Sequence, residues 1–234
     1  MMKYPGVPCC VALTVLLGGC VSGPGPVEEV VVVGSDTMLE LDRRLAESFM
    51  REHPGDRIVV KGGGSGVGIE ALIDGAAAIA AASRPLSAAE VAALHEVHQT
   101  LGIRHLVAQD ALSVFVNAEN AVRDLSMDQL QGLFSGRFED WEEVGGDPGE
   151  VQVVVRPPSS GTHRFFRDHV LGGQVYDPLA VTAPTTRGVL ARVAEIRGAV
   201  GYGGVAYRLE GAVPVAVDGV EPTAENVGRG LYPL

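Results

Sequence analysis

The chain has 234 residues, with 18 Lys and Arg against 29 Asp and Glu, which gives a net charge of −11 near pH 7. A chain this acidic excludes nucleic acid as the expected partner, because phosphate backbones are bound by clustered basic residues. A length of this order fits one large domain or two compact lobes. The negative net charge does not exclude a small anion as ligand, because local N–H dipoles inside a cleft can hold such an anion.

The first twenty residues have the features of an export signal. A weakly positive start at Lys3 is followed by an apolar run at residues 11–17, and Leu17-Gly18-Gly19 precedes Cys20. The apolar run is too short to span a bilayer, which takes roughly 20 residues. A cysteine in this position is similar to the lipidation site of bacterial lipoprotein signals. An ordinary signal peptide that happens to contain a cysteine is the alternative.

This resemblance implies that Cys20 becomes the first residue of the mature chain and carries palmitate as a membrane anchor. We therefore expect a signal peptide at 1–19 and a lipidated tether at 20–29, whose Gly and Pro residues lift the domain off the membrane. The expected location is periplasmic or at the cell surface. The three cysteines are Cys9, Cys10 and Cys20, so the domain beyond has no thiol for a disulfide, a metal or catalysis.

After the tether, strands and helices alternate. Four consecutive valines at 30–33 predict a buried strand, and apolar spacing over 38–51 predicts a helix. The same pattern repeats, with strands at 57–61 and 79–82 and helices at 69–75 and 87–100. Such alternation predicts an α/β fold with a largely parallel sheet, in which ligands bind beyond the carboxyl ends of the strands.

The second half of the chain also mixes strands and helices. We expect strands at 112–117, 151–155, 199–206 and 213–217, and helices at 126–134 and 163–170. We assign residues 30–108 plus 203–234 to lobe 1 and residues 109–202 to lobe 2. The chain then crosses between the lobes twice.

Four short polar stretches each lie after a predicted strand and before a predicted helix. They lie at 34–38, 62–68, 82–84 and 156–162. A helix start offers unpaired N–H groups and partial positive charge, hydroxyls add donors, and glycine lets the backbone approach an anion. Together they predict a site for a small tetrahedral anion, with Arg84 and Arg156 as sources of full charge.

Each stretch alone has a simpler explanation. Ser35 and Ser159 can be helix N-caps, the glycine-rich turn can be flexible, and Arg84 can form a surface salt bridge. The glycine-rich turn lacks the Gly-Lys-Ser/Thr ending of a P-loop, which argues against nucleotide. The order of all four stretches is more informative than any one of them.

That order resembles the phosphate-binding proteins of bacterial phosphate ABC importers, over about residues 30–207. The most specific element is the Arg-x-x-x-Ser-Gly-Thr string at Arg156, Ser160, Gly161 and Thr162. The resemblance implies the two-lobed periplasmic binding protein fold, type II-like, with the ligand between the lobes. The full predicted ligand set is Ser35, Asp36, Thr37, Met38, Ser65, Ser83, Arg84, Arg156, Ser160, Gly161 and Thr162.

One residue departs from well-known members of this family. They place an aspartate where this chain has Ser83, and that carboxylate accepts a proton from hydrogen phosphate while repelling sulfate. We hypothesise that Asp36, beside Thr37 in the first ligand turn, takes over as the acceptor. Asp36 as an N-cap, or as a partner of Arg84 or Arg156, is the alternative.

The resemblance implies a substrate-binding component of an ABC-type phosphate importer, with inorganic phosphate as ligand. Its partners would be ABC permease subunits in the inner membrane, and we expect a monomer without cofactor. The alternative is a non-transport sensor or surface lipoprotein of the same fold that binds another oxyanion or none.

We predict no enzyme, no catalytic residue and no metal site. A nucleophile at Ser65 or Ser160 lacks the Gly-x-Ser-x-Gly register and a clear base, although His163 lies nearby. His95 and His98 share a helix face but do not form His-Glu-x-x-His, so we interpret them as solvated.

Overall fold

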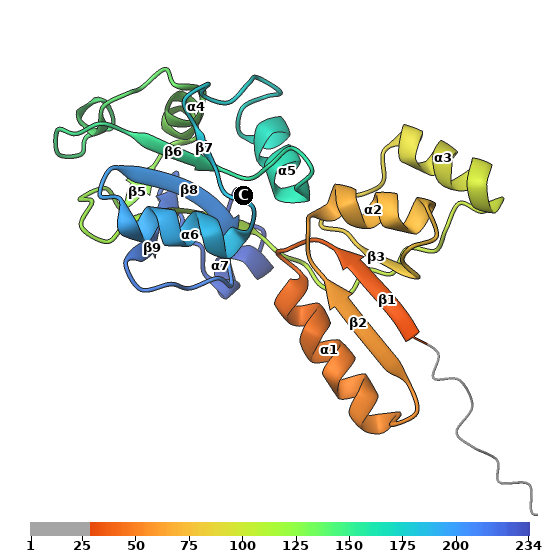
Figure 1. Ribbon diagram of the computed structural model, residues 1–234. Coiled ribbons are helices and arrows are strands. Elements are labelled where there is room, and N and C mark those ends of the chain that lie inside the picture. Colours follow the sequence, from red (N-terminus) through yellow and green to blue (C-terminus); the bar gives the residue numbers. More distant parts are fainter. Residues whose placement is uncertain (1–28) are drawn as a thin grey trace, which may run out of the picture.

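The computed structural model describes residues 29–234, which fold into two lobes (Figure 1). The predicted signal peptide, the lipidation at Cys20 and the tether up to residue 28 lie outside the described residues. Within the described part of the chain, no helix has both the length and the apolar character needed to cross a bilayer.

Lobe 1 is built from the first three strands and three helices. All three strands run parallel in the order β2-β1-β3, as the alternating pattern predicted. The elements are β1 (Glu29–Gly34), α1 (Leu39–Glu52), β2 (Arg57–Lys61), α2 (Ser65–Ile73), β3 (Ile79–Ala81) and α3 (Ala88–His98). Helix α3 begins with a capping box, in which Ser87 and Glu90 each satisfy the other's backbone N–H.

Lobe 2 contains a five-stranded sheet in the order β7-β6-β8-β4-β9 and a two-stranded pair, β10-β5. Strands β6, β7 and β8 are parallel, whereas β4 runs antiparallel to both β8 and β9. The strands are β4 (Leu112–Asn117), β5 (Asp124–Leu125), β6 (Gln152–Val155), β7 (Val181–Thr182), β8 (Ala199–Gly204), β9 (Ala212–Pro214) and β10 (Ala216–Val217). The helices are α4 (Met127–Ser135), the 3-10 turn Trp141–Val144, α5 (Gly161–His169), α6 (Thr186–Glu195) and α7 (Ala224–Gly228).

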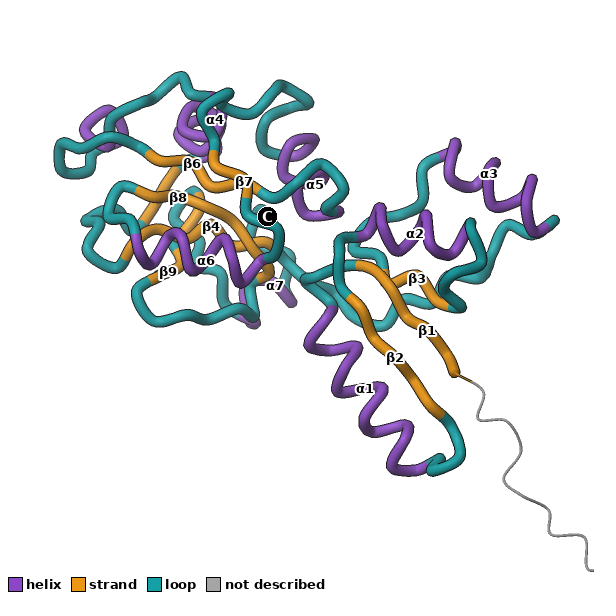
Figure 2. The backbone as a smooth tube through the Cα atoms, in the orientation of Figure 1, coloured by secondary structure: helices purple, strands orange, loops and turns teal. Residues whose placement is uncertain are grey.

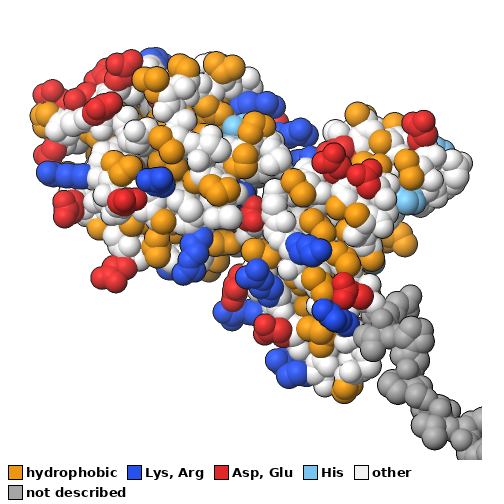
Figure 3. All heavy atoms as spheres, in the orientation of Figure 1, with side chains coloured by type: hydrophobic (Ala, Val, Ile, Leu, Met, Phe, Trp, Pro, Cys, Tyr) orange, Lys and Arg blue, Asp and Glu red, His pale blue; other side chains and the backbone are white. Residues whose placement is uncertain are grey.

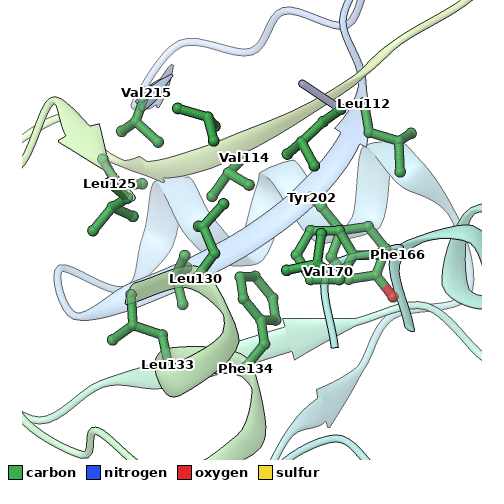
Figure 4. Close-up of a cluster of buried hydrophobic side chains, with 14 of the residues drawn as sticks. Leu112, Val114, Leu125, Leu130, Leu133, Phe134, Phe166, Val170, Tyr202 and Val215 are labelled. Carbon is green, nitrogen blue, oxygen red and sulfur yellow. The ribbon is translucent and has the colours of Figure 1, made fainter. Parts of the chain in front are cut away.

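Both faces of the lobe 2 sheet are buried, and β4 shows why. Val114 and Val116 belong to one apolar cluster with α4 and α5, whereas Phe115 belongs to a second cluster with α6. Successive side chains of a strand point to opposite faces, so an unbroken apolar run fits a strand covered on both sides. In the larger cluster Phe166 stacks on Tyr202 with ring centroids 4.3 Å apart (Figure 4).

The assignment of residues 203–234 to lobe 1 is wrong. Strand β9 pairs with β4, β10 pairs with β5, and Tyr232 and Leu234 pack in the larger lobe 2 cluster. From residue 29 to residue 234 the chain passes between the lobes once, along residues 99–110, and the second predicted crossover is not found. The sequence shows an apolar strand here but not its partner, because strand pairing is a tertiary contact.

Candidate anion site between the lobes

The polar turns of the two lobes meet at the junction, where loops and helix ends face each other (Figure 2). The N–H of Gly66, in the first turn of α2, donates to the carbonyl oxygen of Ser159 at 2.9 Å. Gly161 lies so close to lobe 1 that a Cβ there would stand 2.4 Å from Ser65 Oγ and 2.5 Å from Ser83 Oγ. Glycine at 161 is therefore what lets the predicted stretches converge.

Arg156 is the central cation of this junction. It follows β6, and its side chain is only 1% exposed. Nη1 donates to Thr186 Oγ1 at 2.9 Å, and Nη2 donates to Asp36 Oδ2 at 2.5 Å and to the carbonyl of Pro184 at 3.1 Å. Among the described residues Nε has no acceptor. A buried N–H without a partner is costly, so this donor is suited to a ligand.

Asp36 pairs with Arg156 across the two lobes, which is the alternative that the sequence left open. Its Oδ1 accepts from Gly63 N at 3.2 Å, while Oδ2 accepts from Arg156. The backbone carbonyl of Asp36 also accepts from the hydroxyl of Tyr207, at 2.5 Å. Both carboxylate oxygens therefore have protein donors, which weakens the hypothesis that Asp36 accepts the proton of the anion.

The predicted hydroxyls lie close together but already bond one another. Ser35 Oγ and Thr37 Oγ1 are 2.8 Å apart, and Ser65 Oγ and Ser83 Oγ are 3.0 Å apart. Hydroxyls can rotate, so each can exchange such a bond for one to an anion. Thr37, Ser83 and Thr162 line one cavity of about 100 Å³.

The start of α5 adds backbone donors. Ser160 is its N-cap, and its Oγ accepts from the N–H of His163 at 3.4 Å. Gly161 and Thr162 follow as the first helical residues, and a helix has no internal acceptors for N–H groups in its first turn. Helix α2 begins at Ser65 on the opposing lobe, so two partly positive helix starts face the same junction.

Two of the predicted ligand residues are turned to other partners. Arg84 bonds both carboxylate oxygens of Glu90, at 2.7 and 2.8 Å, and the carbonyl of Pro85. This Arg84 guanidinium lowers the pKa of Glu90 to about 2. The N–H of Met38 donates to the carbonyl of Ser35 at 3.2 Å. Because its guanidinium is paired with Glu90 here, Arg84 as an anion ligand stays a prediction.

Several supporting residues were missed by the sequence analysis. Thr186 and Tyr207 fix the two sides of the Asp36–Arg156 pair, yet lie 30 and 171 residues away from the groups they contact. For Thr186, the one signal in the sequence was the Thr-Thr pair at 185–186, which is typical of a helix start. His163 Nδ1 lies 2.6 Å from the carbonyl of Arg156, and burial lowers the pKa of this histidine.

Tyr202 supports the same backbone from the core side. Its hydroxyl accepts from the N–H of Arg156 at 3.2 Å and lies 3.2 Å from the hydroxyl of Tyr176. Burial raises the pKa of Tyr202 to about 12, so it stays neutral. No group of three or more potential metal ligands occurs among residues 29–234.

These features define a two-lobed solute-binding protein. Residues 21–234 match the family model described as PBP superfamily domain. The chain is 33% identical over 207 residues to the phosphate-binding protein PstS of Bacillus subtilis, with 88% of this chain and 67% of that protein covered. It is 30% identical over 220 residues to PstS of Pseudomonas aeruginosa, with 86% and 68% covered. The chain belongs to the PstS family of phosphate-binding proteins.

Solved structures agree with this assignment. The structure superimposes with a TM-score of 0.81 on a Clostridium perfringens substrate-binding protein assigned to phosphate ABC transport, which holds bound phosphate. The two chains are 28% identical, and the match covers 88% of this chain and 83% of that one. An ABC-type phosphate transport receptor from Vibrio cholerae gives 0.65, at 27% identity and with 88% and 83% covered. The family is one of solute-binding transport proteins and not of enzymes.

Proposed function

We propose that this chain is the phosphate receptor of an ABC importer and captures inorganic phosphate between its lobes. The observation that carries the proposal is the buried Arg156, whose Nε lacks an acceptor among the described residues. It lies beside Ser160, Gly161 and Thr162, the string on which the resemblance to phosphate-binding proteins rests. A tetrahedral oxyanion offers several acceptors to such a fork of donors.

The donors come from both lobes, so binding and closure are coupled. Lobe 1 contributes the turn at Thr37 and the start of α2 at Ser65, while lobe 2 contributes Arg156 and the start of α5. An anion that accepts hydrogen bonds from both lobes binds the closed form more tightly than the open form. Its binding therefore stabilises the closed form. Hinge closure around a ligand is a common transition of this kind. The permease would then recognise the closed form.

The acidic surface is compatible with an anionic ligand. Net charge governs long-range steering, whereas the bound anion is stabilised by short-range dipoles and one cation in a site that excludes water. At the site itself Asp36 offsets the charge of Arg156. Capture should therefore depend on hydrogen-bond geometry more than on net attraction.

The proposal also covers the membrane anchor, the oligomeric state and the permease partner of this receptor. The receptor is held at a membrane through lipidated Cys20, it acts as a monomer, and it delivers phosphate to the permease subunits of an ABC importer in the inner membrane. The leader pattern before Cys20 supports the first statement, and the family supports the last.

The test is calorimetric titration of residues 21–234, the span that the family model matches, after bound anion has been removed. Phosphate, sulfate and molybdate are titrated separately at the same pH and ionic strength. We expect phosphate to bind at least tenfold more tightly than sulfate or molybdate. Absence of binding by all three anions would overturn the proposed function.

A further inference from the structure

His163, the residue directly after Thr162, is bonded through its ring and through both of its backbone groups. Ring atom Nδ1 lies 2.6 Å from the carbonyl oxygen of Arg156. The backbone N–H of His163 donates to Ser160 Oγ at 3.4 Å, and its carbonyl accepts from the hydroxyl of Tyr176 at 2.8 Å. One residue therefore joins the two ends of the turn that leads from Arg156 to the start of α5.

Arg156 is held by side chains at both of its backbone groups. Strand β6 ends at Val155, so Arg156 lies just beyond it. The N–H of Arg156 donates to the hydroxyl of Tyr202 at 3.2 Å, while its carbonyl faces the ring of His163. The hydroxyls of Tyr176 and Tyr202 are 3.2 Å apart and close the set. We call His163, Tyr176 and Tyr202 the Arg156 clamp.

The core of lobe 2 holds the Arg156 clamp in place. Tyr202 is fully buried and stacks on Phe166, with ring centroids 4.3 Å apart (Figure 4). The rings of His163 and Tyr176 also pack together, with centroids 4.5 Å apart. Close-packed interiors leave side chains little freedom to move. The clamp thereby passes the rigidity of the core to the backbone of Arg156.

The bond to Arg156 requires one tautomer of the His163 ring. A carbonyl oxygen can only accept, so the proton of the neutral ring is on Nδ1. Burial lowers the pKa of His163, and the positive charges of Arg167, Arg156 and Arg164 act in the same direction. The ring is therefore neutral near pH 7, with Nδ1–H as donor to the carbonyl and Nε2 without a proton.

We propose that His163 is a positioning residue for phosphate, because its bond to the Arg156 carbonyl fixes the turn that carries the donors of lobe 2. The turn sets the spacing between Nε of Arg156 and the N–H groups at the start of α5. Donors that are already in place lose less free energy to ordering when the anion binds, so affinity should depend on this bond. The inference rests on the proposed capture of phosphate and adds a residue outside the predicted ligand set.

Calorimetry with inorganic phosphate tests the role of the ring donor in residues 21–234. His163→Ala removes this donor and should lower phosphate affinity about fivefold to fiftyfold. His163→Asn keeps a side-chain N–H close to the position of Nδ1 and should bring affinity back to within about threefold of the unaltered chain. Circular dichroism of each variant confirms that it is folded.

His98→Ala is the matched control. His98 also has a ring nitrogen on a backbone carbonyl, with Nε2 2.7 Å from the oxygen of Ile73, but this bond joins α3 to α2 within lobe 1. Loss of the bond at His98 should leave phosphate affinity unchanged. A loss as large as that of His163→Ala would show that any such bond affects affinity, and would overturn the specific role of His163.

Heteronuclear NMR of the histidine side chains reads the tautomer of His163 directly. We expect Nδ1–H near pH 7 in the unaltered chain, with the signal assigned by its loss in His163→Asn. A proton on Nε2 alone would contradict the bond to Arg156 and overturn the inference. This measurement needs no ligand, so it is independent of the proposed function.

The binding outcomes separate the inference from the proposed function. If the unaltered chain binds no phosphate, the proposed function fails, and the role of His163 in binding fails with it. If the unaltered chain binds phosphate and folded His163→Ala binds it equally well, the inference alone is overturned. Equal losses in His163→Ala and His163→Asn would also overturn it, because the N–H donor would then not be the cause.

Tyr176→Phe takes the place of His163→Ala if that variant does not fold. It removes the hydroxyl that bonds the carbonyl of His163 and lies beside Tyr202. We expect phosphate affinity to fall about twofold to tenfold, from the loss of one neutral hydrogen bond of the clamp. Unchanged affinity in folded Tyr176→Phe would then overturn the inference.

Discussion

The two lobes differ in how completely they bury their apolar residues. Lobe 2 contains both buried clusters, and β4 and β8 are buried along their whole length. In lobe 1 the three-stranded sheet buries few side chains fully, and hydrophobic side chains lie at its surface (Figure 3). Leu45 on α1 is 51% exposed, and Ile103 in the segment leading to lobe 2 is 86% exposed.

This difference assigns different physical roles to the lobes. Lobe 2 holds Arg156 and the start of α5 on a packed core. Such support favours donors of the anion site that are already in place before the ligand binds. Lobe 1 presents its donors on turns above a thinner core, and regions with few buried contacts open at lower free energy. Contacts with lobe 2 and with ligand should therefore stabilise lobe 1 more than lobe 2.

The largest expected effect comes from the residue that joins the lobes. Arg156→Gln should reduce phosphate affinity by at least about hundredfold, because charged hydrogen bonds are lost and Asp36 is left buried without its partner. Calorimetry with phosphate measures the change. Arg84→Gln is the matched control, and we expect affinity within about twofold because Arg84 faces Glu90. Equal losses in both variants would contradict the assignment of the site.

A second comparison tests the cores of the two lobes directly. Leu130→Ala in lobe 2 removes a fully buried side chain and should lower the free energy of unfolding by about 2–5 kcal/mol. Leu45→Ala in lobe 1 changes an exposed side chain and should stay within about 0.5 kcal/mol. Urea unfolding followed by circular dichroism gives both values. A loss at Leu45 as large as that at Leu130 would mean that α1 is covered in solution.

The smallest effect tests how tightly the lobes close. Gly66→Ala places a Cβ 3.0 Å from the carbonyl oxygen of Ser159, so the lobes must separate by a few tenths of an ångström. We expect phosphate affinity to fall by less than about tenfold while stability is retained, since alanine suits a helix. Gly228→Ala, where a Cβ meets nothing within 4 Å, should leave binding unchanged. Unchanged binding by Gly66→Ala would show that this contact is absent from the bound form.

Local patterns in the sequence predict most of the helices and strands, and they also mark the polar stretches that meet at the junction. Valine runs and apolar spacing are local features, so the pattern alone predicts the strands of lobe 1 and helices α3 and α4. The string from Arg156 to Thr162 also marked the second-lobe half of the site. Such signals work because caps and periodicity act within a few residues.

Pairing between residues far apart in the chain follows from the tertiary fold and not from any local pattern. Arg156 meets Asp36 across 120 positions, Tyr207 reaches Asp36 across 171, and β9 joins β4 in lobe 2. Arg84 has the same charge as Arg156, but it bonds Glu90 six positions away, whereas Arg156 bonds Asp36 of the other lobe. Which partner a charge or a strand takes depends on the geometry of the whole fold, and spacing along the chain does not encode it.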